Sequence, residues 1–162
     1  MTRDEFGRDA AAIAGLLPHR YPFLLVDRIT SIDGDRRIVG IKSVSADEAN
    51  LTRGPDGRRA LPSLVLLESI AQVGAILLRS RPEHRDRLVF FMGIEHARFR
   101  GFAHAGDTVE LEVIVRQFRG VMGRFTGTAR IGATEIARGT MSFAVGPEKQ
   151  GRDHTASPAQ PA

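Results

Sequence analysis

The chain has 162 residues, a length typical of one domain with a sizeable hydrophobic core. It contains no cysteine, so disulfides, thiolate nucleophiles and cysteine-based metal sites are excluded. The basic residues behind the formal net charge of +4 are almost all arginine, because Lys42 and Lys149 are the only lysines. These arginines are scattered along the sequence, which is typical of an ordinary protein surface, so nucleic acid is not an expected partner.

The sequence also predicts where the protein works. Its N-terminal segment is too charged, and its apolar run too short, for a secretory signal. The long apolar stretch Leu61–Leu78 is interrupted by Ser63, Glu68, Ser69 and Gln72, so it is not expected to span a membrane. We therefore expect a cytoplasmic protein that works without a membrane, a metal or a cofactor.

The first half of the chain predicts a helix, a hairpin and a loop, in that order. Phe6–Leu17 predicts a short amphipathic helix that ends at a proline. Leu24–Ser31 and Arg37–Val44 are rich in Leu, Val and Ile and flank Asp33-Gly34-Asp35, which predicts a β-hairpin. The polar segment Ala46–Arg59 contains glycine and proline and predicts a loop.

A long apolar helix is predicted over Pro62–Ser80, with proline in the first turn, where its missing N–H costs nothing. Four strand-like runs follow it: Leu88–Phe99, Thr108–Phe118, Met122–Ile131 and Glu135–Val145. A helix that is apolar all round must be surrounded by protein. We therefore expect an α+β hotdog fold, in which a curved antiparallel sheet wraps around this helix. One domain is expected over residues 1–145, and the polar segment 146–162 is expected to be a disordered tail.

Four segments in register resemble the 3-hydroxyacyl-acyl-carrier-protein dehydratases of the hotdog fold: Leu17–Ile29 (LPHRYPFLLVDRI), Leu64–Gln72 (LVLLESIAQ), Met92–Val113 and Gly123–Val145. The resemblance implies fatty-acid or related acyl-chain biosynthesis, with a thioester of acyl carrier protein or coenzyme A as the ligand. It also implies a dimer whose sheets pair, or a trimer of such dimers.

The resemblance implies a role for several residues and leaves one role empty. In this family a histidine stands fourteen positions before a helix carboxylate; here Glu68 takes the position of that catalytic acid, and Gly54 takes the position of the histidine. Gly57 keeps a glycine of the loop, and the N–H of Ser63 takes the place of the donor to the thioester carbonyl. Gln72 takes the next polar position on the helix face, so these last three residues are expected to contact substrate.

The chemistry of dehydration shows why the absence of a histidine at position 54 matters. The reaction removes a proton from C2, protonates the departing hydroxyl and stabilises an enolate-like oxygen. Histidine suits the first step, a buried glutamate suits the second, and an N–H at a helix N-terminus suits the third. Because losing a general base typically costs a factor of roughly 10²–10⁴, we predict altered or partner-dependent catalysis.

Two further segments carry residues with expected roles. Arg98 and Arg100 flank Phe99 in a segment that, by resemblance, lies near the tunnel mouth, so they are expected to bind the carrier or its phosphate. A solvated strand face explains these arginines equally well. His19 belongs to the family's Pro-His-Arg segment and is expected to be structural or to line the entrance, rather than to act as the base.

Three alternatives to dehydration by this chain alone stay open. The chain could complete a shared site in a heterodimer with a paralogue that provides the histidine. It could hydrolyse acyl thioesters, with Glu68 activating a water that Gln72 orients. It could also bind acyl thioesters without catalysis.

Overall fold

The computed structural model of the protein describes residues 9–148, which form a curved sheet and several helices. Helix α1 spans Ala10–Leu16, and the Asp9 side chain caps it by accepting a hydrogen bond from the N–H of Ala12 at 2.9 Å. The predicted first residues of this helix, from Phe6, lie outside the described part of the chain. Helix α2 spans Ser63–Arg79, as predicted to within one residue at each end.

The main sheet of the described chain has six antiparallel strands in the spatial order β1-β2-β7-β8-β9-β5. The strands are β1 Arg28–Asp33, β2 Arg37–Ser43, β5 Arg87–Phe99, β7 Thr108–Arg119, β8 Met122–Ile131 and β9 Thr134–Glu148. The predicted hairpin is confirmed, because β1 pairs with β2 around Gly34, whose φ of 49° suits a tight turn. Strand β9 continues past the predicted domain end at Val145, and the rest of the predicted tail, residues 149–162, lies outside the described residues.

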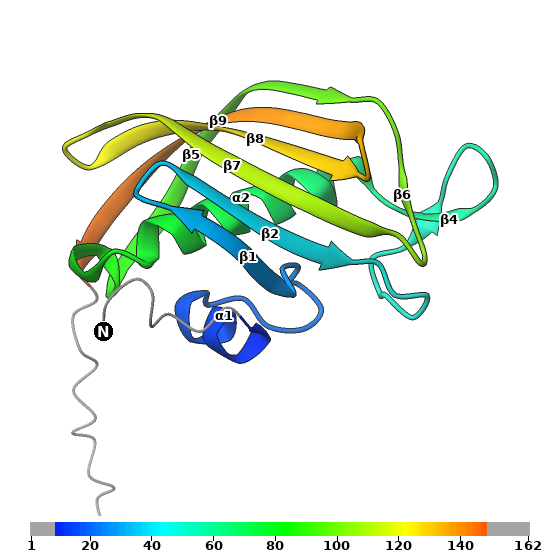
Figure 1. Cartoon of the computed structure of the whole chain (residues 1–162), viewed down its shortest axis with the longest axis horizontal. Coiled ribbons are helices and arrows are strands. Elements are labelled where there is room, and N and C mark those ends of the chain that lie inside the picture. Colours follow the sequence, from blue (N-terminus) through cyan, green and yellow to red (C-terminus); the bar gives the residue numbers. More distant parts are fainter. Residues whose placement is uncertain (1–8, 149–162) are drawn as a thin grey trace, which may run out of the picture.

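Helix α2 packs against the sheet and forms the core of the molecule, so the predicted hotdog arrangement is confirmed. Figure 1 shows α2 lying along one face of the sheet, with strands β2, β7, β8, β9 and β5 curving past it. Two glycines permit this close approach: a Cβ on Gly74 would stand 2.9 Å from the Phe125 ring, and a Cβ on Gly127 would stand 2.0 Å from Ile70. The helix and sheet therefore pack at distances that side chains at these positions would not allow.

The predicted loop Ala46–Arg59 is only partly a loop. It contains β3, Thr52–Arg53, and the start of β4, Arg59–Leu61. Strand β4 pairs with β3 on one side and with β6, Ala103–His104, on the other, which makes a small second sheet. These strands are too short to show a period of two in the sequence, which explains why they were not predicted. In the part of the chain that is described, no helix is long and apolar enough to cross a membrane.

Strand β5 forms one edge of the main sheet, because it pairs with β9 on one side only. It carries five exposed large apolar side chains: Phe90, Phe91, Met92, Ile94 and Phe99, with exposed fractions from 38% to 60%. Long apolar edge strands invite pairing with another chain, and contiguous apolar patches mark interaction surfaces. This apolar edge lies beside α2, because Phe91 and Ile94 share a cavity wall with residues of that helix.

Candidate active site

The predicted acid, Glu68, lies in the wall of an apolar cavity of about 210 Å³ between α2 and the sheet. The other lining residues are Leu64, Leu67, Ala71, Phe91, Ile94 and Met141. Glu68 is the one ionisable side chain of this lining, and its side chain is 28% exposed. The carboxylate therefore stands at the boundary between the apolar cavity and water, rather than sealed in the core as the sequence predicted.

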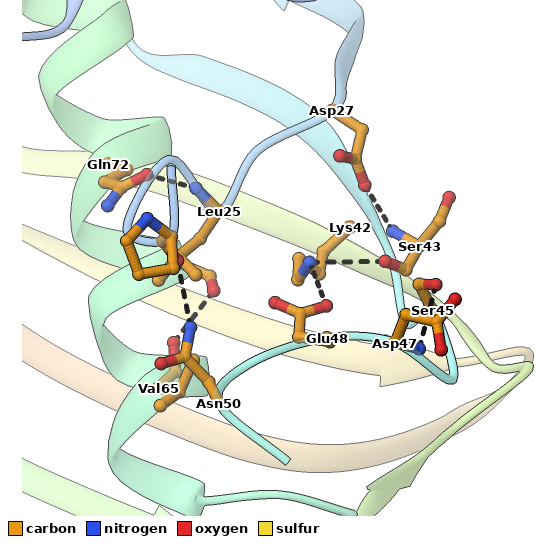
Figure 2. A network of polar contacts seen from close by, with 12 residues as sticks. Leu25, Asp27, Lys42, Ser43, Ser45, Asp47, Glu48, Asn50, Val65 and Gln72 are labelled. Carbon is orange, nitrogen blue, oxygen red and sulfur yellow. Dashed lines mark hydrogen bonds and ion pairs between the residues drawn. The ribbon is translucent and has the colours of Figure 1, made fainter. Parts of the chain in front are cut away.

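Gln72 lies one helical turn after Glu68 and joins α2 to the segment before β1. Its Oε1 accepts the N–H of Leu25 at 2.9 Å, as Figure 2 shows. Its Nε2 donates to the carbonyl oxygen of Phe23 at 2.8 Å and to Oε1 of Glu68 at 3.0 Å. Because Gln72 is buried, these bonds hold residues 23–25 against α2 and restrict the Glu68 carboxylate at the same time.

The loop that follows β2, residues 44–51, is held in place by a separate polar network. The Lys42 ammonium is buried and contacts Oε2 of Glu48 at 2.7 Å, while Asp27 accepts the N–H of Ser43 (Figure 2). Asn50 donates to the carbonyl oxygen of Pro22 at 3.0 Å. These contacts tie the segment after β2 to the segment before β1, and they hold both segments against β2.

His19 meets Glu68 in space, although the sequence did not predict this contact. Its Nε2 lies 3.6 Å from Oε1 of Glu68, and its ring lies 5.9 Å from the ring of Phe23. The Nδ1 atom is buried and has no hydrogen-bond partner among the described residues. The structure therefore brings together His19, Glu68 and Gln72, which the sequence analysis had assigned to different roles.

The predicted loop positions lie apart from this cluster within one chain. The N–H of Gly54 donates to the carbonyl oxygen of Arg58 at 2.8 Å, and Gly57 has a φ of 79°. Neither glycine lines the cavity that contains Glu68. Asp56 of this loop lies 3.4 Å from Nε2 of His104 in β6, so the loop is bonded to the small sheet. Ser63 is the first residue of α2, where its N–H precedes the helical hydrogen bonds.

Arg98 and Arg100 line a second and larger cavity, of about 480 Å³. Arg138 also lines it, directly across from Arg98 in the pairing of β5 with β9, and bonds to Glu135 through Nε at 3.1 Å. The hydrogen bond from Arg138 holds the pKa of Glu135 below its ordinary value, against the opposing effect of burial and with help from nearby arginine charges. The sequence analysis missed Arg138. Its position opposite Arg98 follows once the register of β5 against β9 is known.

Residues 9–148 contain no group of three His, Cys, Asp or Glu side chains that could hold a metal ion. The carboxylate of Glu68, beside the imidazole of His19 and the amide of Gln72, is suited to proton transfer. The arginine cavity offers a separate place for an anion.

Comparison with known proteins shows the family. Residues 17–140 match the FabA-like domain. The 3-hydroxyacyl-[acyl-carrier-protein] dehydratase FabZ of Desulforamulus reducens is 41% identical over 138 residues, which cover 85% of this chain and 97% of that protein. FabZ of Moorella thermoacetica is 42% identical over 138 residues, covering 85% and 96%. The chain belongs to this family of FabZ-like dehydratases.

A solved structure supports the fold independently of sequence. The dehydratase heterocomplex ApeI:P from Xenorhabdus doucetiae matches with a TM-score of 0.70 and covers 85% of this chain and 91% of its own. Its sequence identity of 20% is low, so this likeness shows the shared hotdog fold alone.

Proposed function

We propose that this chain acts on 3-hydroxyacyl thioesters of acyl carrier protein, in fatty-acid or related acyl-chain biosynthesis, with Glu68 as its acid–base group. The observation that carries the proposal is the position of Glu68, the one ionisable side chain in the wall of an apolar cavity beside α2. An apolar wall suits an acyl chain, and a carboxylate at its rim suits the polar reacting end. The FabZ relatives bear this dehydratase activity in their names.

The start of α2 offers the group that the thioester oxygen needs. Ser63 is the first helical residue, so its N–H has no acceptor within the helix and lies at the positive end of the helix dipole. Removing one such donor from an oxyanion site costs about 3 kcal/mol in transition-state stabilisation. We therefore assign the N–H of Ser63 to the carbonyl oxygen of the thioester, as the family resemblance implies, and Gly57 to the loop beside it.

The position of the missing histidine sets the limit on turnover. Gly54 offers no side chain for proton transfer, and a Cβ placed on it would stand 3.1 Å from Oδ1 of Asp56. We expect the chain alone to react roughly 10²–10⁴-fold more slowly than a relative with a histidine there. A partner that provides a histidine would remove this deficit.

The edge of the sheet supports a partner along β5. Phe91 and Ile94 are exposed on this edge strand and also line the cavity of Glu68, so a second subunit on β5 would close that cavity. Closing it would exclude water and strengthen the electrostatic interactions of Glu68. We propose a homodimer, or a heterodimer with a histidine-bearing paralogue, which could assemble further into a trimer of dimers.

The arginine cavity is proposed to receive the phosphate of the carrier's prosthetic arm. Arg98, Arg100 and Arg138 line it together with a single carboxylate, Glu135, which also lies 3.8 Å from Arg130. Arginines directly across strands repel each other unless an anion offsets their charge. The excess of positive charge and the fork geometry of arginine both favour a phosphate or an acidic helix of the carrier.

The test is a product analysis by mass spectrometry. The purified chain, alone and mixed with a histidine-bearing paralogue, is incubated with 3-hydroxyacyl carrier proteins of several chain lengths. We expect loss of water to give the enoyl product, and Glu68→Gln should abolish it. Replacing Arg98 and Arg100 by alanine should raise KM for the carrier thioester, whereas Arg116→Ala, at an exposed arginine of β7, should leave it unchanged. Absence of enoyl product under both conditions would refute the proposal.

Thioester hydrolysis is the second candidate, because Gln72 contacts Glu68 and the two could share a water. However, both N–H groups of the Gln72 amide have acceptors, at Phe23 and at Glu68, so the amide has no further N–H for a water. This geometry favours a positioning role for Gln72. Release of free carrier thiol from saturated acyl thioesters, without enoyl product, would select hydrolysis, and tight binding without either product would select a binding protein.

A further inference from the structure

The backbone around His19 is fixed from both sides, which gives its side chain a defined place beside α2. Arg20 donates through Nη1 to the carbonyl oxygens of Leu17, at 2.9 Å, and His19, at 2.7 Å. On the other side, the bonds of Gln72 hold Phe23 and the residues after it against the helix. His19 is therefore held at Glu68 by the same segment that Gln72 anchors.

The two oxygens of the Glu68 carboxylate stand in different surroundings. Oε1 accepts a hydrogen bond from Nε2 of Gln72 at 3.0 Å and faces Nε2 of His19 at 3.6 Å. Within residues 9–148, Oε2 accepts no hydrogen bond and is left for a ligand. Oε1 is thus held by Gln72 and lies beside the His19 ring, while Oε2 is free to transfer a proton.

The surroundings of the imidazole favour one neutral tautomer. Nδ1 of His19 is buried without a partner among the described residues, and a buried N–H without an acceptor is the rarer and costlier arrangement. The neutral ring therefore carries its proton on Nε2, the atom that faces Oε1 of Glu68. In this form His19 is a donor aimed at the carboxylate, not a free base.

We infer that His19 is a positioning residue for Glu68, and that the held carboxylate performs both proton transfers of dehydration through Oε2, which lets the reaction proceed, though more slowly, without a histidine at position 54. This inference rests on the proposed function. Oε2 takes the C2 proton as the C2–H bond breaks, and the electron pair passes into the enolate. The same oxygen then gives this proton to the C3 hydroxyl. The C3–O bond breaks, the C2–C3 double bond forms, water leaves, and Glu68 is ionised again.

Three substitutions at His19 separate this role from simple packing. The amide nitrogen of glutamine reaches the place of Nε2, that of asparagine reaches the place of Nδ1, and methionine fills the volume without an N–H. We expect His19→Gln to keep kcat within about threefold, because it restores the donor to Oε1. His19→Asn and His19→Met should lose roughly 10–10²-fold in kcat with KM unchanged, the size expected for a misplaced catalytic group. His84→Gln, at a histidine packed on Phe118, is the control for loss of an imidazole elsewhere and should leave kcat unchanged.

The inference is overturned if His19→Gln is as impaired as His19→Met, or if all three variants match the wild type. An assay that does not need turnover separates this result from failure of the proposed function. The imidazole ¹⁵N signals of His19, identified by their loss in His19→Gln, should report a proton on Nε2 and should shift in Glu68→Gln. If the wild type forms no enoyl product but this shift occurs, the proposed function fails and the positioning contact stands. If no shift occurs, the inference fails.

Discussion

Replacing Gln72 by leucine should destabilise the fold, because this one amide satisfies backbone groups that no other described residue reaches. Its Oε1 accepts the N–H of Leu25, a residue with no exposed surface, and its Nε2 donates to the carbonyl oxygen of Phe23. Leucine fills nearly the same volume on α2, so the substitution removes the hydrogen bonds without opening a cavity. The expected loss therefore measures the cost of the abandoned polar groups.

The magnitude follows from the burial of the two partners. A buried N–H left without an acceptor costs about 1–3 kcal/mol, and Leu25 lies in this class. Phe23 is 43% exposed, so its carbonyl oxygen can turn to water at a smaller cost. We expect the free energy of unfolding to fall by about 2 kcal/mol. For a chain of this size that corresponds to a Tm lower by about 4–8 °C.

The measurement is urea unfolding at one fixed protomer concentration, because association makes apparent stability depend on concentration. Ser69→Ala is the matched control on the same helix. Its buried hydroxyl donates to the Val65 carbonyl one turn earlier, so its loss should cost less than about 1 kcal/mol. If Gln72→Leu is as stable as the wild type to within about 0.5 kcal/mol, the assumed cost of the Leu25 N–H is wrong.

Three more predictions test packing and charge. Gly127→Ala should destabilise by about 1–3 kcal/mol, because its Cβ would stand 2.0 Å from Cγ2 of Ile70; a second substitution, Ile70→Leu, should recover part of the loss in thermal unfolding. Lys42→Met should cost about 3–5 kcal/mol by leaving Glu48 buried alone, and the double variant with Glu48→Leu should regain most of it; an equal loss in both would contradict this reasoning. Burial, more than the neighbouring charges, holds the pKa of His84 below its ordinary value. The stability that neutral His84 contributes is therefore full above about pH 6.5 and is lost as the pH falls further. In His84→Phe the free energy of unfolding should change less between about pH 7 and pH 5 than in the wild type.

The elements with strong local patterns could be predicted from the sequence. The long helix was predicted to within one residue at each end, because seventeen consecutive, mostly apolar residues without a proline leave little choice. The four long strands of the second half were predicted from alternating apolar residues and glycine turns. The two-residue strands β3 and β6 were missed, because they exist only through pairing with β4.

The parts of the site that lie on one helix could also be predicted. Glu68 and Gln72 share a face of α2 by their spacing alone, and their side chains do touch. The degree of burial of Glu68 was predicted too high, because the helix sequence does not reveal that the cavity opens beside β5. His104 of β6 makes a further contact that depends on the fold, because its side chain is only 14% exposed and pairs with Asp56.

The sequence by itself determined that one carboxylate stands in a long apolar helix and that the helix needs a sheet around it, because composition and periodicity are local properties of the chain. Only the tertiary structure decided what that carboxylate meets. His19 and the apolar edge of β5 come to Glu68 from distant parts of the chain. Their meeting depends on how the whole sheet curves and packs on α2, and no short segment encodes that curvature.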